Sequence, residues 1–415
     1  MTPTNKKLLI IGTVWPEPRS SAAGSRMMEL IEFFQHDGFE ITFTCSASNL
    51  EFSEDLENLG VKTKKIKIND SAFDTFIQEL NPTIVLFDRF MTEEQFGWRI
   101  IEHCPDAIRI LDTEDLHSLR YGRHKAFKEG REFSNDDLYS NEARREIASI
   151  YRCDLSLIIS RYEMELLTNF FKVNSSILHY LPFMKEPVSE SEQQELPRFS
   201  DRAHFVSIGN FLHEPNWDAV RFLKEEIWRL IRKELPKAEL HIYGAYTSPK
   251  VIQLHNAKEG FLIKGRAEDV REVVQNSRVL LAPLRFGAGL KGKLVDAMRY
   301  GTTSVTTDIG AEGLFTENGW GGSIENAPKQ IADRSIYLYT NKEHWEEAQE
   351  KGFQNFNSLF DKEMHSKAFK RRVQQLSEEI VQHRNKNFMG SVLNQSTIQS
   401  YKYMSKWIEE KNKNS

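Results

Sequence analysis

The stretch Val279–Leu314, VLLAPLRFGAGLKGKLVDAMRYGTTSVTTDIGAEGL, has the pattern of one strand–loop–helix–strand unit. Its first four residues form an apolar run that Pro283 ends, as expected of a buried parallel strand. The small residues of Gly287–Gly289 remove side chains from the following turn, so that backbone can approach a ligand closely. An amphipathic helix is expected next, ending at Gly301, and the β-branched run 302–306 predicts a second strand.

The start of this expected helix has the composition of an anion site. A helix N-terminus presents unpaired N–H groups and partial positive charge, and Arg285, Lys291 and Lys293 add cations at the same end. A phosphate is therefore the expected guest, and the carboxylate of Asp296, in the first turns of the helix, could accept two ribose hydroxyls. A glycine-rich turn with solvated lysines fits the spacing equally well.

Length and composition limit the classes of protein. A chain of 415 residues predicts two domains, and a net charge of −5 argues against a dedicated nucleic-acid binder. Three cysteines do not suggest a disulfide framework, so we expect them to be reduced and buried. The apolar run after Lys7 is too short for a signal peptide, and no stretch approaches a membrane span. We therefore expect a cytoplasmic protein.

Strand and helix patterns alternate along both halves, which predicts two parallel sheets covered by helices on both faces, an α/β fold. The first domain is expected over residues 1–184 and the second over 203–385, joined by the polar linker 185–202. After Leu314 helices dominate, and 386–415 is the last of them. Ligands collect at the carboxyl ends of parallel strands, which places Asp88, Arg89 and 112–117 near any active site.

The opening stretch resembles the donor-binding motif of the large retaining GT-B glycosyltransferase family (family 4, or group 1), which holds many bacterial cell-wall, capsule and lipopolysaccharide enzymes. Asp296 matches the second acidic position of that motif. Ala288 stands at the first, where the family has an acid that touches the donor sugar. The run 285–293 is similar to the Arg–x–Gly–x–Gly–x–Lys–x–Lys loop of a sub-branch, and 310–314 matches the next family loop.

The resemblance implies a GT-B fold, two Rossmann-like domains facing a cleft, with the last helix crossing back to the first domain. It also implies roles for single residues. His117 would position the donor sugar, and Lys293 and Arg285 would stabilise the leaving group, as catalytic residues. The donor-binding residues would be Gly24, Asn216, Gly265, Arg266, Gly287, Ala288, Gly289, Leu290, Lys291 and Asp296.

The implied reaction moves a sugar from a nucleotide-diphosphate sugar to a glycan, lipid or other acceptor with retention of anomeric configuration. No Asp-x-Asp triplet and no Cys/His cluster with metal spacing occurs, so we expect neither a metal nor another cofactor. Because of Ala288, a non-catalytic nucleotide-sugar-binding subunit stays open, as does a GT-B sugar-nucleotide epimerase. An oxidoreductase is disfavoured because neither half has a dinucleotide fingerprint.

Simpler interpretations of several residues also stay open. His117 could be a hydrogen-bonding loop residue, Arg266 a plain surface arginine, and Gly24 part of a surface loop. The basic run Arg120–Arg131 is interpreted first as a solvated helix face. Contact of this run with a phosphate-bearing acceptor, or with the inner face of the membrane, is the alternative.

Overall fold

The structure is a computed structural model that describes residues 6–48 and 51–413, without the side chains of 396–399 and 413. The N-terminal half forms a seven-stranded sheet in the order β3-β2-β1-β4-β5-β6-β7, and each neighbouring pair is parallel. Its strands are β1 (Lys7–Gly12), β2 (Glu40–Cys45), β3 (Lys62–Lys65), β4 (Ile84–Asp88), β5 (Ile108–Asp112), β6 (Leu155–Ile158) and β7 (Leu178–Tyr180).

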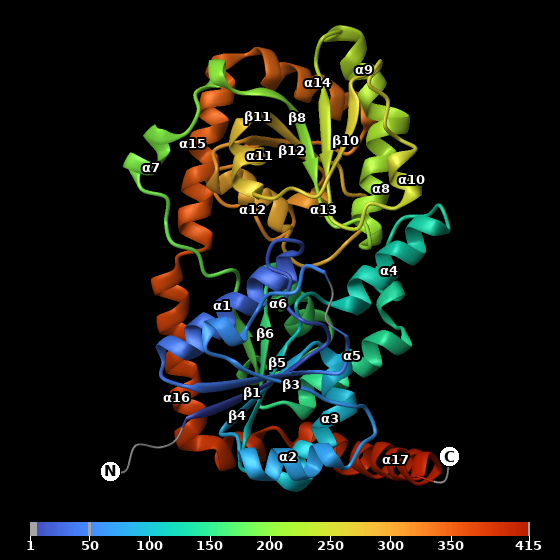
Figure 1. Ribbon diagram of the computed structural model, residues 1–415, viewed down its shortest axis with the longest axis vertical. Helices are drawn as coiled ribbons and strands as arrows, with labels where there is room; N and C mark the ends of the chain where they lie inside the picture. Colours follow the sequence, from blue (N-terminus) through green and yellow to red (C-terminus); the bar gives the residue numbers. More distant parts are fainter. Residues whose placement is uncertain (1–5, 49–50, 414–415) are drawn as a thin grey trace.

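Helices cover both faces of this sheet, as the apolar strands require. In β1, Leu8 and Ile10 pack into one core cluster while Leu9 and Ile11 pack into another on the opposite face. The helix α1 lies on the first face and α2, α3 and α5 on the second (Figure 1). The helices are α1 (Ala22–His36), α2 (Ala72–Leu80), α3 (Phe90–His103), α4 (His117–Lys128), α5 (Asn141–Arg152) and α6 (Arg161–Glu165).

The C-terminal half repeats this design with a parallel six-stranded sheet in the order β10-β9-β8-β11-β12-β13. Its strands are β8 (Ala203–Ile208), β9 (Leu240–Tyr243), β10 (Phe261–Gly265), β11 (Ser277–Ala282), β12 (Thr303–Thr306) and β13 (Gly322–Ile324). The opening stretch forms β11, α12 (Gly292–Arg299) and β12, as predicted. The strand β13 lies where helices were expected to dominate, and its three residues carry little pattern of their own.

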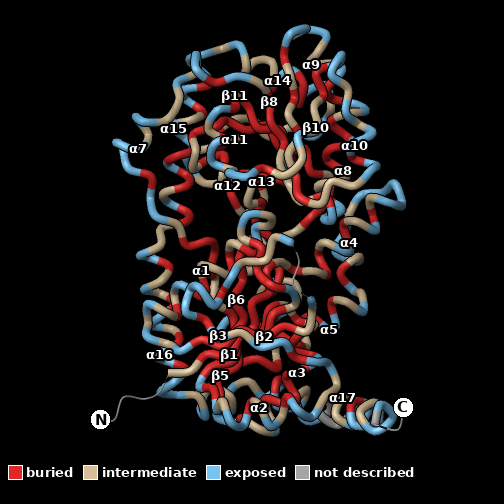
Figure 2. Tube along the Cα trace, in the orientation of Figure 1, coloured by how far each residue is buried: buried red, intermediate tan, exposed pale blue. Residues whose placement is uncertain are grey.

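Two core clusters again lie on opposite faces of the sheet. Leu281 and Val279 pack with α8, α9 and α14, whereas Leu280 and Ala282 pack with α11, α12 and α15. Figure 2 shows the buried segments of each domain concentrated along the strands. The helices of this half are α8 (Glu214–Phe222), α9 (Trp228–Glu234), α10 (Pro249–Ile252), α11 (Val270–Asn276), α13 (Asp308–Ala311), α14 (Pro328–Thr340) and α15 (Lys342–Leu359).

The chain returns to the N-terminal domain earlier than expected. After α15, the helix α16 (Lys362–Lys386) runs down beside the N-terminal domain, followed by α17 (Phe388–Lys413) beneath it (Figure 1). Phe369, Val373 and Leu376 of α16 belong to the same core cluster as β1. The second domain therefore ends near Leu359 rather than at 385, because the apolar side of α16 is buried against the first domain.

The connection between the domains also has some structure of its own. The segment 185–202 contains the short helix α7 (Glu190–Glu195), and Arg202 at its end is buried against Thr302 and the carbonyl of Tyr300. The three cysteines are free and buried, as expected. Among the described residues, no helix combines the length and the apolar composition that a membrane crossing requires.

Candidate active site

The two domains enclose a cavity of about 590 Å³ at the carboxyl ends of their strands. The loops after β1, β4 and β5 line it from the N-terminal domain, and the loops after β8, β9, β10 and β11 line it from the C-terminal domain. Parallel sheets collect ligands at this edge, and a volume of several hundred Å³ is typical of small-molecule sites. The cavity thus lies between the two domains, where the site was expected.

The loop before α12 approaches the N-terminal domain so closely that it needs glycine. The backbone of Gly289 is left-handed, with φ +63°, and a Cβ there would lie 2.8 Å from the Cβ of Asp115. Its N–H donates to the Glu163 carboxylate at 2.8 Å, and its carbonyl accepts from Lys291 Nζ at 2.7 Å. All five residues of 287–291 line the cavity, including Ala288 and Leu290.

Lys293 is the cation of the opening stretch that is best placed to meet an anion. Its Nζ donates to Asn216 Oδ1 at 2.7 Å, and burial lowers its pKa to about 7. Both residues line the cavity. Within the described residues, the N–H groups of Gly292 and Lys293 have no protein acceptor, as expected in the first turn of a helix. This end of α12 thus combines free donors with a nearby cation.

Asp296 lies one turn further along α12 and also lines the cavity. Burial raises its pKa to about 6, which Lys185 and Arg299 partly oppose. Its carboxylate has no hydrogen bond or ion pair among the residues that the structure describes. A partly buried acceptor without a partner, on the same helix as an anion site, suits a pair of ligand hydroxyls.

His117 is the first residue of α4 and lines the cavity from the N-terminal domain. Its Nε2 lies 3.5 Å from Asp115 Oδ1 and is buried without a hydrogen-bond partner. Burial lowers its pKa to about 4, although Asp115 opposes this shift. The imidazole is therefore neutral at pH 7 and can exchange hydrogen bonds with a bound hydroxyl.

Two charged contacts join the domains beside this loop. The Arg123 guanidinium of α4 binds both carboxylate oxygens of Glu312, at 2.8 and 2.6 Å, and also donates to the carbonyl of Gly287 at 2.9 Å. The Glu163 carboxylate accepts from Gly289, as described above, and from the N–H of Leu116 at 3.1 Å. These contacts hold the glycine-rich loop against the N-terminal domain.

A second set of contacts joins the domains through the loops after β1 and β2. The Tyr246 hydroxyl donates to the Glu17 carboxylate at 2.7 Å. The Arg266 guanidinium lies over the Phe52 ring, 4.4 Å from its centroid, and its Nε has no partner. Gly24 packs so tightly against the backbone of Glu17 that a Cβ would lie 2.4 Å from it, and its N–H is held by Ser21 Oγ. The Gly24 N–H therefore takes part in capping α1 and is not free to bind a donor nucleotide.

Two expected site residues do not line the cavity. Arg285 forms a bidentate ion pair with Asp218, at 2.6 and 2.9 Å, and its guanidinium lies between the rings of Phe127 and Phe222. Gly265 ends β10, where its carbonyl accepts from Gly244. The structure therefore gives no geometric support to Arg285 as a group that stabilises the leaving phosphate, because its charge is already paired.

The basic run after His117 is not a solvated face throughout, which corrects the first interpretation. Arg123 is buried in the contact between the domains, and Arg120 donates to Asp115 at 2.6 Å. His124 stacks on Phe286 of the other domain, with ring centroids 4.3 Å apart. Among the basic residues of the run, only Lys125, Lys128 and Arg131 are exposed. Sequence spacing could not show this, because the partners lie on other elements.

Three residues that line the cavity share a strained, left-handed backbone. Arg89, Glu114 and Tyr246 line the cavity with φ values of +70°, +63° and +60°. Such conformations are costly for these residue types and collect at functional sites. Asp88 and Arg89 were expected near the site because they end a strand, and both line the cavity, whereas Tyr246 was missed because it had no signal in the sequence.

Residues 202–341 match the family model described as "Glycosyl transferases group 1". No curated protein matches the chain. Among solved structures, the chain is similar to a sucrose-phosphate synthase from Thermosynechococcus elongatus (TM-score 0.66, 14% identity, covering 89% of this chain and 99% of that one). It is also similar to Anabaena HepE, described in complex with UDP-glucose (TM-score 0.63, 12% identity, 90% and 99% covered). The chain is also similar to TarM (TM-score 0.67, 11% identity, covering 89% of this chain and 99% of that one).

At these identities the structural likeness shows the fold, and the fold is GT-B: two parallel α/β domains that face each other across a cavity. The match of residues 202–341 adds the class of domain, since these residues contain the loop and helix with Lys293 and Asp296. The chain thus has the GT-B fold that the resemblance implied, and its C-terminal domain contains a region that matches group 1 glycosyltransferases.

Proposed function

We propose that the chain transfers a glycosyl group from a nucleoside-diphosphate sugar to a glycan or lipid-linked acceptor, with retention of anomeric configuration. The observation that carries the proposal is the N-terminal end of α12, where Lys293, two free N–H groups and Asp296 face one cavity. The group 1 match of the domain that contains them supports it. So do similar structures described as bound to UDP or UDP-glucose.

In this proposal the diphosphate lies at the start of α12. The Lys293 ammonium and the N–H groups of Gly292 and Lys293 offset the charge that develops on the leaving nucleoside diphosphate. Asp296 accepts the two ribose hydroxyls. The positive charge already present at this end supports binding without a metal ion, which is also part of the proposal.

The sugar then lies toward the N-terminal domain, where Asp115 and His117 line the cavity. The His117 imidazole is neutral there. Among the described residues, His117 Nε2 has no hydrogen-bond partner, so it can bond a sugar hydroxyl. The acceptor would enter from the side of the N-terminal domain, along the loop after β1. Attack by the acceptor from the face that the leaving group occupies gives retention without a protein nucleophile, so we assign none.

The test is a thermal-shift screen of the full chain against UDP, GDP, ADP and dTDP sugars, with magnesium and with EDTA. A nucleotide that binds only the folded state raises the melting temperature. We expect one class of base to raise it without magnesium, and Lys293→Ala and Asp296→Asn to abolish the rise. UDP sugars come first because similar structures hold UDP. No rise with any of the nucleotides contradicts the donor site.

A bound donor is then incubated with candidate acceptors, and the product is analysed by NMR for the configuration of the new glycosidic bond. An α-linked product from an α-linked donor supports retention, and an inverted product contradicts it. Release of a changed sugar nucleotide without acceptor identifies an epimerase instead. Binding with neither transfer nor slow donor hydrolysis identifies a non-catalytic subunit, the alternative that Ala288 raises.

A further inference from the structure

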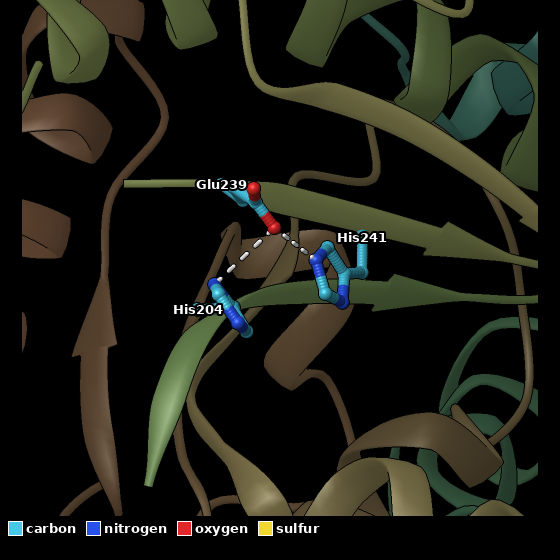
Figure 3. Close-up of side chains that lie close together, drawn as sticks. All are labelled: His204, Glu239 and His241. Carbon is cyan, nitrogen blue, oxygen red and sulfur yellow. Dashed lines mark hydrogen bonds and ion pairs between the residues drawn. The ribbon is translucent and has the colours of Figure 1, made fainter. Parts of the chain in front are cut away.

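A cluster of two histidines and a glutamate lies in the C-terminal domain, outside the cavity. Figure 3 shows His204 of β8 and Glu239 and His241 of the neighbouring strand converging on one point. One ligand atom of each residue lies within 4.8 Å of the others. His204 is far from the other two residues in the sequence, and Glu239 and His241 alone form no metal-binding motif. Sequence analysis therefore did not find the cluster.

The register of the sheet explains why the three side chains meet. The parallel strands β8 and β9 pair Phe205 with Leu240 and Val206 with His241. The same register places His204 opposite Glu239, and paired residues of adjacent strands point to the same face of a sheet. His241 lies two residues after Glu239 and therefore also points to that face. The arrangement is thus fixed by the backbone and not by long flexible side chains.

The distances suit a small divalent cation. Glu239 Oε2 lies 2.8 Å from His241 Nε2 and 3.6 Å from His204 Nδ1. The ligands of tetrahedral zinc, each about 2.0–2.2 Å from the metal, lie about 3.3 Å from one another. The two measured separations bracket this value, so small side-chain rotations would bring the atoms onto one ion. Two imidazoles and one carboxylate are also a donor set that zinc and related transition metals prefer.

The surroundings leave access for an ion and for solvent. The side chains of His204 and Glu239 are about 40% exposed, whereas His241 is largely buried. A water molecule can therefore supply the fourth ligand. Glu239 is the acid of the cluster, and Lys264 is a cation close enough to act on both Glu239 and His241. Lys264 weakens the attraction for a cation without filling the ligand positions.

The backbone at His204 adds a second observation. His204 has φ +62°, a left-handed conformation that is uncommon for a histidine, and its N–H donates to the Tyr339 hydroxyl at 3.3 Å. The two imidazole rings stack with centroids 4.4 Å apart. The strained backbone thus turns the His204 ring onto the other two ligands, and strain of this kind persists where a site requires it.

We propose that His204, Glu239 and His241 bind one divalent transition-metal ion, with zinc as the reference ion and water as the fourth ligand. The site lies at the start of β8, and the cavity begins at Ile208 at the end of this strand, roughly 13 Å away at 3.3 Å per residue. The ion therefore cross-links two adjacent strands of the C-terminal domain and takes no part in sugar transfer.

The experiment uses the untagged full-length chain, stripped with EDTA and desalted. Zinc affinity and stoichiometry are measured in competition with a chromophoric chelator, and Co²⁺ absorption reports the coordination geometry. We expect one tight zinc site per chain, a tetrahedral Co²⁺ spectrum, and a melting temperature that rises with zinc but not with magnesium. No zinc binding, or zinc binding without a rise in melting temperature, contradicts the proposal.

Matched variants locate the ion. His204→Asn keeps a residue type that tolerates the left-handed backbone, and with His241→Ala and Glu239→Gln it should weaken zinc binding at least tenfold. His36→Ala is the control, because exposed His36 also lies beside a glutamate, 3.7 Å from Glu32, and should leave the affinity unchanged. Equal loss in the control, or no loss in the other three, overturns the assignment. Unchanged melting of each metal-free variant shows that it folds.

Discussion

At the scale of single residues, Lys293 shows how burial sets the chemistry of the site. Among the described residues, the Lys293 ammonium contacts Asn216 and no acid, so no negative charge offsets the cost of burying it. Burial therefore lowers its pKa to about 7. A diphosphate that arrives at this end of α12 would restore the proton. Lys293 is therefore only partly charged in the empty site at pH 7 and becomes fully charged when the leaving group binds.

This predicts that affinity for a nucleoside diphosphate falls as pH rises above 7, up to about tenfold per pH unit. In Lys293→Met the affinity should be weaker at pH 6 and should change little up to pH 8. A remaining fall above pH 8 is expected from Lys291, whose pKa burial lowers to about 8. Calorimetric titration at pH 6, 7, 8 and 9 measures both curves, and parallel curves for the two proteins would refute the assignment.

The stability of the empty protein should change with pH in the opposite direction. Because the pKa of Lys293 is lower in the folded chain than its ordinary value of 10.5, the unfolded chain binds more protons between pH 7 and pH 10.5. The contribution of Lys293 to the free energy of unfolding therefore increases with pH across that window and is lost as pH falls to 7. Comparing the wild type with Lys293→Met isolates this contribution.

At the scale of elements, α16 shows that a helix late in the chain can complete an early domain. Phe369 is fully buried between α1 and β7, with its ring 4.7 Å from Phe33, 5.8 Å from Phe34 and 5.4 Å from His179. The Arg384 guanidinium adds a bond to Asp154 at the start of β6. Helix α1 covers part of this face of the N-terminal sheet, and the cover is completed only when the chain has returned from the second domain.

We therefore expect Phe369→Ala to lower the free energy of unfolding of the N-terminal domain by about 3–5 kcal/mol, the usual loss for a buried phenylalanine. Urea denaturation followed by fluorescence and circular dichroism measures it. Trp407→Ala on α17 is the control, since Trp407 is 66% exposed, and it should change the stability by less than about 0.5 kcal/mol. Equally small effects of the two changes would contradict the role of α16 in the first core.

At the scale of the whole molecule, buried charges hold the two domains together around the cavity. Arg123 and Glu312 are close to fully buried, and removal of one partner would leave an uncompensated charge in the interface. The same arginine holds the carbonyl of Gly287, so the contact also fixes the loop that lines the cavity. Opening of the two domains would break this contact.

Arg123→Ala is therefore expected to favour an open arrangement. The radius of gyration from small-angle X-ray scattering should increase, and affinity for the donor nucleotide should fall at least tenfold, the equivalent of about 1.4 kcal/mol. Arg131→Ala is the matched control, because Arg131 pairs with Asp137 and Glu129 inside the N-terminal domain alone. Scattering curves that coincide for all three proteins would show that the contact between Arg123 and Glu312 does not set the domain arrangement.

The sequence by itself determined the alternation of strands and helices, the two parallel sheets and the helix α12 with its cations. These features are local: apolar runs, glycines and caps act over a few residues, so their pattern can be read along the chain. The same locality placed Asp88 and Arg89 at the edge of the sheet, because the end of a strand is visible in the sequence.

Only the tertiary structure decided which charges are free. Arg285 and Lys293 are equivalent by sequence, yet Asp218 neutralises the first while the second faces the cavity. The sequence also gave no sign of three other features: the early return of α16, the burial of Arg123, and the proximity of His204 to Glu239. Each depends on contacts between residues far apart in the chain. Those contacts form only when the helices pack on the two sheets and the two domains face each other.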